Sequence, residues 1–212
     1  MGKEINKFIG QIIRGILEII YPKESTCLIC NEPEVEGLCY KCKSKITFCK
    51  EEELCIGYYK GPLKELILAF KYKKDFSAGE VLVNLIENKI KELGKDYYLT
   101  FIPISNKSLK ERGFNQCEYL AKELGFRNNL KVMDTLEKVK ETKIQKTLSK
   151  DERAVNLQGA FKVKEGNRVA GNKFVLIDDV ITTGATIQEG IRELKENGAK
   201  EIKILTLGKS HI

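Results

Sequence analysis

The 212-residue sequence lacks any apolar run that approaches the roughly 20 residues needed to cross a bilayer. Its N-terminal apolar stretch, FIGQIIRGILEII, is interrupted by Gln11, Arg14 and Glu18, and no small-residue cleavage site follows it. A signal peptide is therefore not expected. We interpret residues 1–20 as an amphipathic helix that packs on the protein, with docking to a membrane surface as the alternative. These absences predict no integral membrane span and a cytoplasmic location.

The chain also lacks internal repeats, low-complexity segments and a long Gly/Ser linker. Any small accessory unit is therefore expected to pack against the main core. A Walker-type G-x-x-x-x-G-K-[ST] sequence is absent too, which disfavours an ATP-driven DNA motor. Histidine occurs once, and His211 near the chain end is not expected to be a catalytic base.

Charges of both signs are abundant, and neither dominates strongly. The 37 Lys and Arg residues against 30 Asp and Glu residues give a net charge of +7. This balance suits an anionic ligand or a weak nucleic-acid-binding surface without establishing either. The 42% hydrophobic content allows one full-sized core and a small accessory unit, and nothing in the sequence indicates an oligomeric state.

Cysteine is present in clusters. Two C-x-x-C pairs are formed by Cys27, Cys30, Cys39 and Cys42. Because thiols stay reduced in the cytoplasm, a disulfide framework is disfavoured, whereas four thiolates at this spacing can surround one Zn²⁺ ion. We predict a structural zinc site, with redox-active or simply buried cysteines as the alternatives. Cys49 or Cys55 could replace one ligand, and Cys117 is expected to pack in a helix.

Helical and strand patterns alternate from Gly57 onward. Helical spacing of apolar residues covers 63–74, 79–94, 113–125 and 185–198, with the last three segments ending at a glycine. Buried strands are predicted over 97–104, 173–180 and 201–207. This alternation is typical of an α/β fold with a parallel sheet flanked by helices. We therefore divide the chain into the N-terminal helix, a zinc module over 21–56 and an α/β domain over 57–212.

The stretch FVLIDDVITTGATIQEG, residues 174–190, contains the strongest functional signal. Ligands of open parallel sheets bind at the carboxyl ends of strands, where Asp178 and Asp179 are expected to emerge. The following turn enters a helix, and its backbone N–H groups can form an anion cradle. The cradle residues are Thr182, Thr183, Gly184, Ala185 and Thr186. The neighbouring carboxylates would instead bind hydroxyl groups of the ligand or Mg²⁺. A ligand with a phosphate at one end and a vicinal diol nearby is a ribose 5-phosphate.

VLIDDVITTGAT resembles the motif with which type I phosphoribosyltransferases bind 5-phosphoribosyl-1-pyrophosphate (PRPP). The resemblance implies that Asp178 and Asp179 hold the ribose hydroxyls directly or through magnesium, while residues 182–186 take the 5-phosphate. Because consecutive side chains of an extended segment diverge, the two acids are expected to have different roles. One would contact the ribose, and the other would either orient the loop or take a catalytic role at the charge that develops at C1. An ordinary strand–turn–helix with acidic surface residues is the alternative.

Two further segments, LKERGFNQCEYLA (109–121) and KVKETKIQKTLSKDERAVNLQGAF (138–161), resemble the ComF family. Its members join a four-cysteine zinc module to a phosphoribosyltransferase domain. The matching positions of the second segment are Thr142, Gln145, Leu148, Arg153, Asn156, Gly159, Ala160 and Phe161. The sequence departs from the expected arginine by carrying Lys138 and Lys140, which keep the charge but lose the bidentate fork.

Breaking the bond from C1 to pyrophosphate requires cations where negative charge accumulates. Residues 138–153, which include Lys140, Gln145 and Arg153, are rich in cations and suit a flexible loop closing over PRPP. A solvated charged loop is the alternative. Further cationic candidates for binding PRPP are Lys107, Arg112 and Lys71.

The motifs and the family resemblance lead to two hypotheses for the function. The first is Mg²⁺-dependent ribosyl transfer from PRPP to an unidentified acceptor. The ComF resemblance implies a link to DNA uptake and transformation, so the second is a non-catalytic PRPP-sensing or single-stranded-DNA-binding competence protein. Partners on this view are PRPP, single-stranded DNA, and competence helicase or recombination proteins. A purely structural zinc protein does not explain the segment from Asp178 to Thr186.

Overall fold

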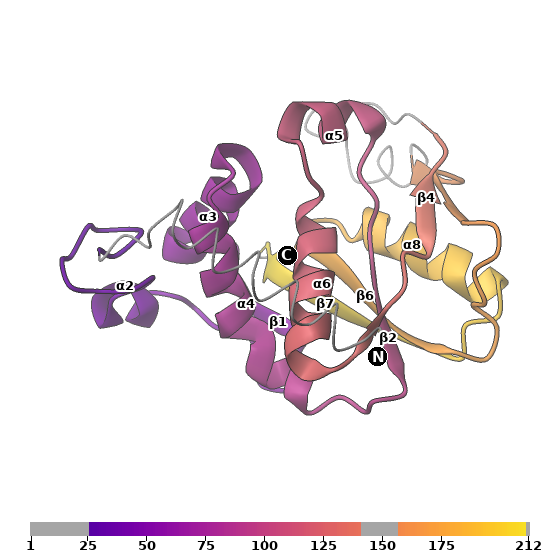
Figure 1. Ribbon diagram of the computed structural model, residues 1–212, viewed down its shortest axis with the longest axis horizontal. Helices are drawn as coiled ribbons and strands as arrows, with labels where there is room; N and C mark the ends of the chain where they lie inside the picture. The colour runs from indigo at the N-terminus through magenta and orange to yellow at the C-terminus, as the bar shows by residue number, and fades with distance from the viewer. Residues whose placement is uncertain (1–25, 141–156, 211–212) are drawn as a thin grey trace, which may run out of the picture.

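The computed structural model describes residues 26–140 and 157–210. A five-stranded sheet in the order β1-β7-β6-β2-β3 forms its centre (Figure 1). The strands are β1 (Cys55–Tyr58), β2 (Tyr97–Phe101), β3 (Lys131–Val132), β6 (Lys173–Ile181) and β7 (Glu201–Lys209). Every neighbouring pair is parallel, which confirms the predicted α/β class.

The central strand β6 is buried from Phe174 to Asp179 because helices cover both of its faces. Val175 and Ile177 face one hydrophobic core, and Phe174 and Leu176 face the other. The alternation follows from the two-residue period of a strand. β2 ends at Phe101, earlier than expected, and β7 runs two residues beyond the expected end.

Three helices that precede β6 in the chain cover one face of the sheet. They are α3 (Gly61–Leu68), α4 (Phe76–Lys91) and α6 (Gln116–Asn128), whose apolar residues share a core with Val175 and Leu205. The opposite face is covered by α8 (Ala185–Glu196) through Ile187 and Leu194. This arrangement places one layer of helices on each side of the sheet (Figure 1).

Two short elements interrupt the expected helices. A single π-helical turn, η1 (Ala69–Lys73), follows α3, and Lys74 closes it in the left-handed conformation. A separate short helix, α5 (Asn106–Arg112), precedes α6 and was not anticipated from the sequence. It begins after Ser105, whose hydroxyl accepts a hydrogen bond from the N–H of Ser108.

The expected helix stop at Gly125 is wrong. α6 continues to Asn128, and Asn129 closes it with a φ of +51°. Gly125 serves close packing instead, because a Cβ there would lie 2.5 Å from Cγ2 of Val132. α4 likewise ends at Lys91, before Gly94, whereas Gly198 follows α8 in the left-handed conformation as expected.

β4 (Leu136–Lys138) and β5 (Phe161–Val163) form a two-stranded antiparallel sheet. In the sequence, β4 precedes residues 141–156 and β5 follows them. Leu136 and Phe161 are buried in the core beneath α8. Most of the predicted flexible loop over 138–153, including Gln145 and Arg153, lies outside the described residues. So do the predicted N-terminal helix over 1–20 and His211.

The four-cysteine segment lies beside α4 and contains the short helix α2 (Tyr40–Ser44). Leu28, Ile29 and Leu38 pack against the main core. Gly37, with a φ of +79°, allows this approach, because a Cβ there would lie 2.8 Å from Cγ2 of Val81. The predicted boundary at residue 57 falls within β1, which pairs with β7 from Cys55 onward.

Among the helices in the described part of the chain, none combines the length and apolarity that a bilayer crossing requires.

Candidate functional site

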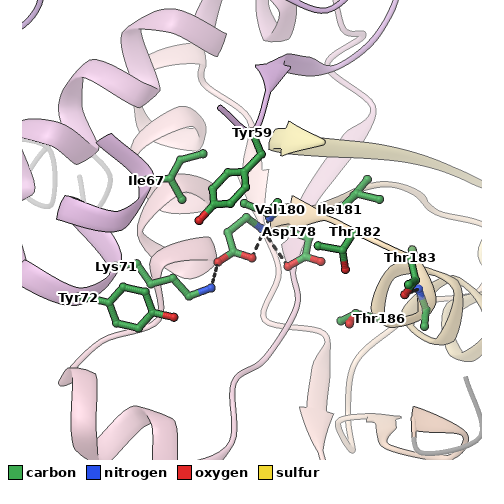
Figure 2. A pocket seen from close by; sticks show the side chains of 13 residues that line it. Tyr59, Ile67, Lys71, Tyr72, Asp178, Val180, Ile181, Thr182, Thr183 and Thr186 are labelled. Carbon is green, nitrogen blue, oxygen red and sulfur yellow. Dashed lines mark hydrogen bonds and ion pairs between the residues drawn. The ribbon is translucent and has the colours of Figure 1, made fainter. Parts of the chain in front are cut away.

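Strand β6 carries Asp178 and Asp179 to the carboxyl edge of the sheet, where a cavity of about 330 Å³ opens. Both carboxylates are nearly buried, with 8% and 7% of each residue exposed. We call this cavity the β6 pocket. Its lining comprises Tyr59, Ile67, Lys71, Tyr72 and residues 178–186. Figure 2 shows Lys71 and Tyr72 on one side of Asp178 and Thr183 and Thr186 on the other.

Asp178 accepts a hydrogen bond from the N–H of Asp179 through Oδ1, at 2.9 Å. Burial, followed by the charge of Asp179, raises the pKa of Asp178 to about 8. The carboxyl group is therefore mostly protonated near neutral pH. A cation or hydroxyl ligand would favour its ionised form.

Asp179 has a different environment, because its carboxylate is surrounded by donors. Lys71 Nζ forms an ion pair with Oδ2, and Gln116 Nε2 donates to the same oxygen at 3.1 Å. The N–H of Val180 donates to Oδ1 at 2.8 Å. Burial opposes ionisation, yet the charge and hydrogen bond of Lys71 outweigh it, and the pKa of Asp179 is lowered. The pKa values of the two adjacent acids are therefore shifted in opposite directions.

Lys71 reaches the pocket from the π-helical turn η1, which lies 108 residues before Asp179 in the sequence. Single π-helical turns occur frequently at functional sites because they redirect one side chain. Burial disfavours the charged form of Lys71, but the charge of Asp179 offsets this and raises its pKa. The pocket therefore holds a half-buried cation in contact with a buried acid.

The predicted anion cradle lies at the opposite end of the pocket. Gly184 precedes α8 with a φ of +79°, in the left-handed region that favours glycine. The nearest atom to a Cβ built there would be Ile181 Cγ2 at 3.9 Å, so open space adjoins the backbone. Because α8 begins at Ala185, its N–H groups and dipole favour an anion at this point.

The remaining predicted site residues lie at different distances from the pocket. Arg112 adjoins it, since its guanidinium lies 5.4 Å from the Tyr72 ring centroid and Nη1 donates to Gln116 Oε1 at 3.3 Å. Lys107 is exposed on α5 and is not among the lining residues. Lys140 is exposed, with Nζ donating to the Gln158 carbonyl oxygen at 3.4 Å. Gln145 and Arg153 lie outside the described residues.

Three residues of the pocket lining were not anticipated from the sequence, namely Tyr59, Ile67 and Tyr72, and neither was Gln116, which contacts Asp179. Gln116 is 3% exposed and links Arg112 to Asp179. Its place directly after GFN in the segment 109–121 was the available signal. Tyr59 follows β1, and its N–H donates to the Lys209 carbonyl oxygen at 2.9 Å. Identifying β1 as a strand of the parallel sheet would have placed this tyrosine at the site.

The second candidate site is the four-cysteine cluster, whose Sγ atoms all lie within 4.8 Å of one another. A tetrahedral zinc with Zn–S bonds of about 2.3 Å would separate them by about 3.8 Å, so the cluster fits the ion. The N–H of Cys39 donates to Cys27 Sγ at 3.4 Å. Burial alone would raise the pKa of Cys27, but backbone donors lower it to about 6, which favours a thiolate ligand.

Cys49 and Cys55 do not join this cluster. Their sulfur atoms lie 2.9 Å from each other, and neither belongs to the four-cysteine group. Cys117 is buried in the main core, in agreement with the expected packing role.

Comparison with known proteins finds a matching domain family and similar solved structures. The model of the phosphoribosyl transferase domain family matches residues 108–211. Among solved structures, a purine phosphoribosyltransferase from Pyrococcus horikoshii is 20% identical, with a TM-score of 0.39 over 62% of this chain and 73% of that chain. The parallel sheet, the β6 pocket and the family match define a phosphoribosyltransferase-like protein.

Two relatives show which family of phosphoribosyltransferase-like proteins the chain belongs to. Competence protein ComFC of Streptococcus pneumoniae is 31% identical over 188 residues, covering 87% of this chain and 80% of that protein. Competence protein F of Haemophilus influenzae is 28% identical over 220 residues, covering 93% and 95% respectively. The chain belongs to the ComF family.

Proposed function

We propose that the β6 pocket binds PRPP together with Mg²⁺ and that the protein transfers the phosphoribosyl group to an acceptor, releasing pyrophosphate. The observation that supports this proposal is one cavity in which Asp178 lies between the turn that precedes α8 on one side and Lys71, paired with Asp179, on the other. A ribose with a 5-phosphate and a C1 pyrophosphate needs these groups in this order.

The chain's own residues would bind the substrate as follows. Backbone N–H groups around Gly184 and Ala185 take the 5-phosphate, and the threonine hydroxyls nearby add donors. Asp178 and Asp179 take the ribose hydroxyls directly or through Mg²⁺. Carboxylate oxygens are ligands that Mg²⁺ prefers, so both acids fit the ion. When bound, Mg²⁺ would neutralise charge that develops on the pyrophosphate.

Cations of the pocket would stabilise the leaving group. Lys71 lines the cavity and its Nζ forms an ion pair with Asp179, and the Arg112 guanidinium lies over the Tyr72 ring. We assign these two cations to the pyrophosphate oxygens. Asp178 and Asp179 are themselves nearly buried, and a bound substrate would displace the remaining water that could compete with the acceptor for C1.

Calorimetric titration with PRPP, with and without Mg²⁺, tests binding. We expect saturable binding that requires Mg²⁺ and that collapses in Asp179→Asn. A screen of nucleobases for pyrophosphate release then tests turnover. Mg²⁺-dependent binding without release with any acceptor would leave the non-catalytic PRPP sensor as the function, and no binding would remove both.

A link to DNA uptake is the next part of the proposal. Three relatives carry the name competence protein, and others are called DNA utilization protein YhgH. We extend this role to the present chain, with single-stranded DNA and competence helicase or recombination proteins as candidate partners and the cytoplasm as its location.

Direct binding of single-stranded DNA is a second candidate function, favoured by an exposed aromatic and basic surface beside the pocket. Tyr72 and Phe76 are 57% and 49% exposed, and Arg112 lies over the Tyr72 ring. Aromatic rings beside cations provide stacking positions for unpaired bases. We expect affinity for a single-stranded oligonucleotide to fall steeply with salt and with Tyr72→Ala. Undetectable or salt-independent binding would contradict this role.

A further inference from the structure

Cys49 and Cys55 form a second thiol pair, separate from the four-cysteine cluster. Their Sγ atoms lie 2.9 Å apart, in hydrogen-bond contact. Cys49 is half-buried, and Cys55 is 3% exposed. The pair therefore has one sulfur that solvent can reach and one that it cannot.

Backbone hydrogen bonds hold the two sulfurs together. The segment before Cys49 runs antiparallel to β1, with a bridge between Phe48 and Gly57. The N–H of Cys49 donates to the Ile56 carbonyl oxygen at 3.0 Å, and the N–H of Tyr58 donates to the Thr47 carbonyl oxygen at 2.9 Å. β1 is in turn a strand of the main sheet. The approach of the sulfurs is thus fixed by the fold and not by side-chain rotation alone.

We propose that Cys49 and Cys55 are a reversible dithiol–disulfide pair, which low-molecular-weight disulfides such as oxidised glutathione convert to an intramolecular disulfide. The proposal is independent of PRPP binding and of the zinc site.

The reaction proceeds in two exchanges. The Cys49 thiolate attacks one sulfur of the small disulfide, forms a mixed disulfide and expels one small thiolate. The Cys55 thiolate then attacks the Cys49 sulfur and expels the second. Two electrons pass from the protein pair to the small disulfide, and the two thiol protons end on the two released thiolates.

The charges around the pair favour the second exchange. Burial raises the pKa of Cys55, and the hydrogen bond and negative charge of Cys49 raise it further, whereas Lys209 lowers it. Once Cys49 has entered the mixed disulfide, its charge is gone. Lys209, held by Glu53 at 2.5 Å, remains nearby as the favourable cation. Cys55 therefore loses its proton more readily after Cys49 has reacted.

The test uses the full chain loaded with zinc. The protein is incubated with excess oxidised glutathione, quenched with an alkylating reagent, and analysed by intact mass and peptide mapping, while zinc release is followed with a chromogenic chelator. We expect two fewer alkyl groups than on the reduced protein alkylated in the same way, a crosslink between the peptides of Cys49 and Cys55, retained zinc, and return of both thiols after treatment with a reductant.

Two variants separate the exchanges. Cys55→Ser, or Cys55→Ala if serine is not tolerated at this buried position, should stop at a glutathione adduct on Cys49. Cys49→Ser should leave Cys55 unmodified, because it is buried. A stable glutathione adduct on wild-type Cys49, an unreacted pair, or a disulfide that involves the four-cysteine cluster with loss of zinc would overturn the proposal. These wild-type outcomes decide the matter even if a variant fails to fold.

Discussion

At the scale of single residues, Asp178 and Asp179 show how one peptide bond can separate two chemical roles. Both are buried, yet Lys71 and Gln116 contact only Asp179. The lowered pKa of Asp179 and the raised pKa of Asp178 follow from this difference. The β6 pocket thus holds one ionised and one mostly protonated carboxyl group. Assignment of these groups to ribose, Mg²⁺ or C1 stays a prediction.

The raised pKa of Asp178 predicts a pH-dependent stability. The unfolded state ionises near the ordinary value of 3.8 and the folded state near about 8, so between them the folded state holds an extra proton. Stability should therefore fall as pH rises through this window. Asp178→Asn cannot ionise, and its free energy of unfolding relative to wild type should increase from about pH 5 to about pH 7.5, by up to about 3 kcal/mol. Urea denaturation at both pH values measures this difference.

Glu137→Gln provides the control, because Glu137 is an exposed carboxylate away from the pocket. The lowered pKa of Asp179 acts below 3.8, outside the window measured. An Asp178→Asn stability difference that stays constant with pH would show that the buried carboxyl group is ionised throughout.

Gln116 is predicted to position Asp179. Gln116→Ala leaves one Asp179 oxygen with Lys71 alone and removes an acceptor from Arg112. Loss of a buried hydrogen bond to a charged group costs about 1–3 kcal/mol, so the affinity for Mg²⁺ and PRPP should fall about tenfold or more. Gln188→Ala, at an exposed position of α8, is the matched control. Equal PRPP affinity in the two folded variants would argue against this role.

At the scale of elements, the turn between β6 and α8 should tolerate little change at Gly184. Alanine at a left-handed position costs roughly 1–2 kcal/mol of stability. Gly166 has a φ of +82° and open space around it, so Gly184→Ala and Gly166→Ala should lose similar stability. PRPP affinity should fall only in Gly184→Ala, because the backbone approaches the phosphate there. Equal PRPP affinities in the two variants, measured by calorimetry, would show that this turn does not bind the phosphate.

The zinc module gives a second prediction at this scale. Cys42→Ser should lower bound zinc below about half an equivalent, whereas Cys49→Ser should retain about one. Elemental analysis of the purified proteins provides the measurement. The Cys42→Ser variant should also unfold at a lower temperature, because Leu28, Ile29 and Leu38 pack on the main core. Substantial zinc in Cys42→Ser, or its loss in Cys49→Ser, would reassign the ligands.

Several elements could be predicted because their signals are local. The apolar run of β6, the helix after Gly184 and the spacing of the four cysteines each depend on neighbouring residues. The end of α6 could not be predicted from glycine alone. Gly125 is needed for contact with Val132, and Asn129 takes the left-handed position. Chain reversal and close packing both favour glycine, and only the tertiary structure separates them.

At the scale of the whole molecule, the β6 pocket combines segments that lie far apart in the chain. Tyr59 and Lys71 precede the segment matched by the phosphoribosyl transferase domain model, which begins at residue 108. Their position depends on β1 joining the sheet beside β7 and on η1 turning toward Asp179. Sequence patterns identify the acids and the cradle, but they do not encode a contact between residues 71 and 179. From the sequence alone, Lys71 could therefore be proposed only as one of several cationic candidates for binding PRPP.

The central claim is that the β6 pocket holds PRPP, and a crystal structure determined with PRPP and Mg²⁺ tests it most directly. We predict the 5-phosphate against the backbone N–H groups at Gly184 and Ala185, with the ribose and the metal ion facing Asp178 and Asp179. Electron density for PRPP at another surface, or a β6 pocket that stays empty at saturating PRPP and Mg²⁺, would contradict the account.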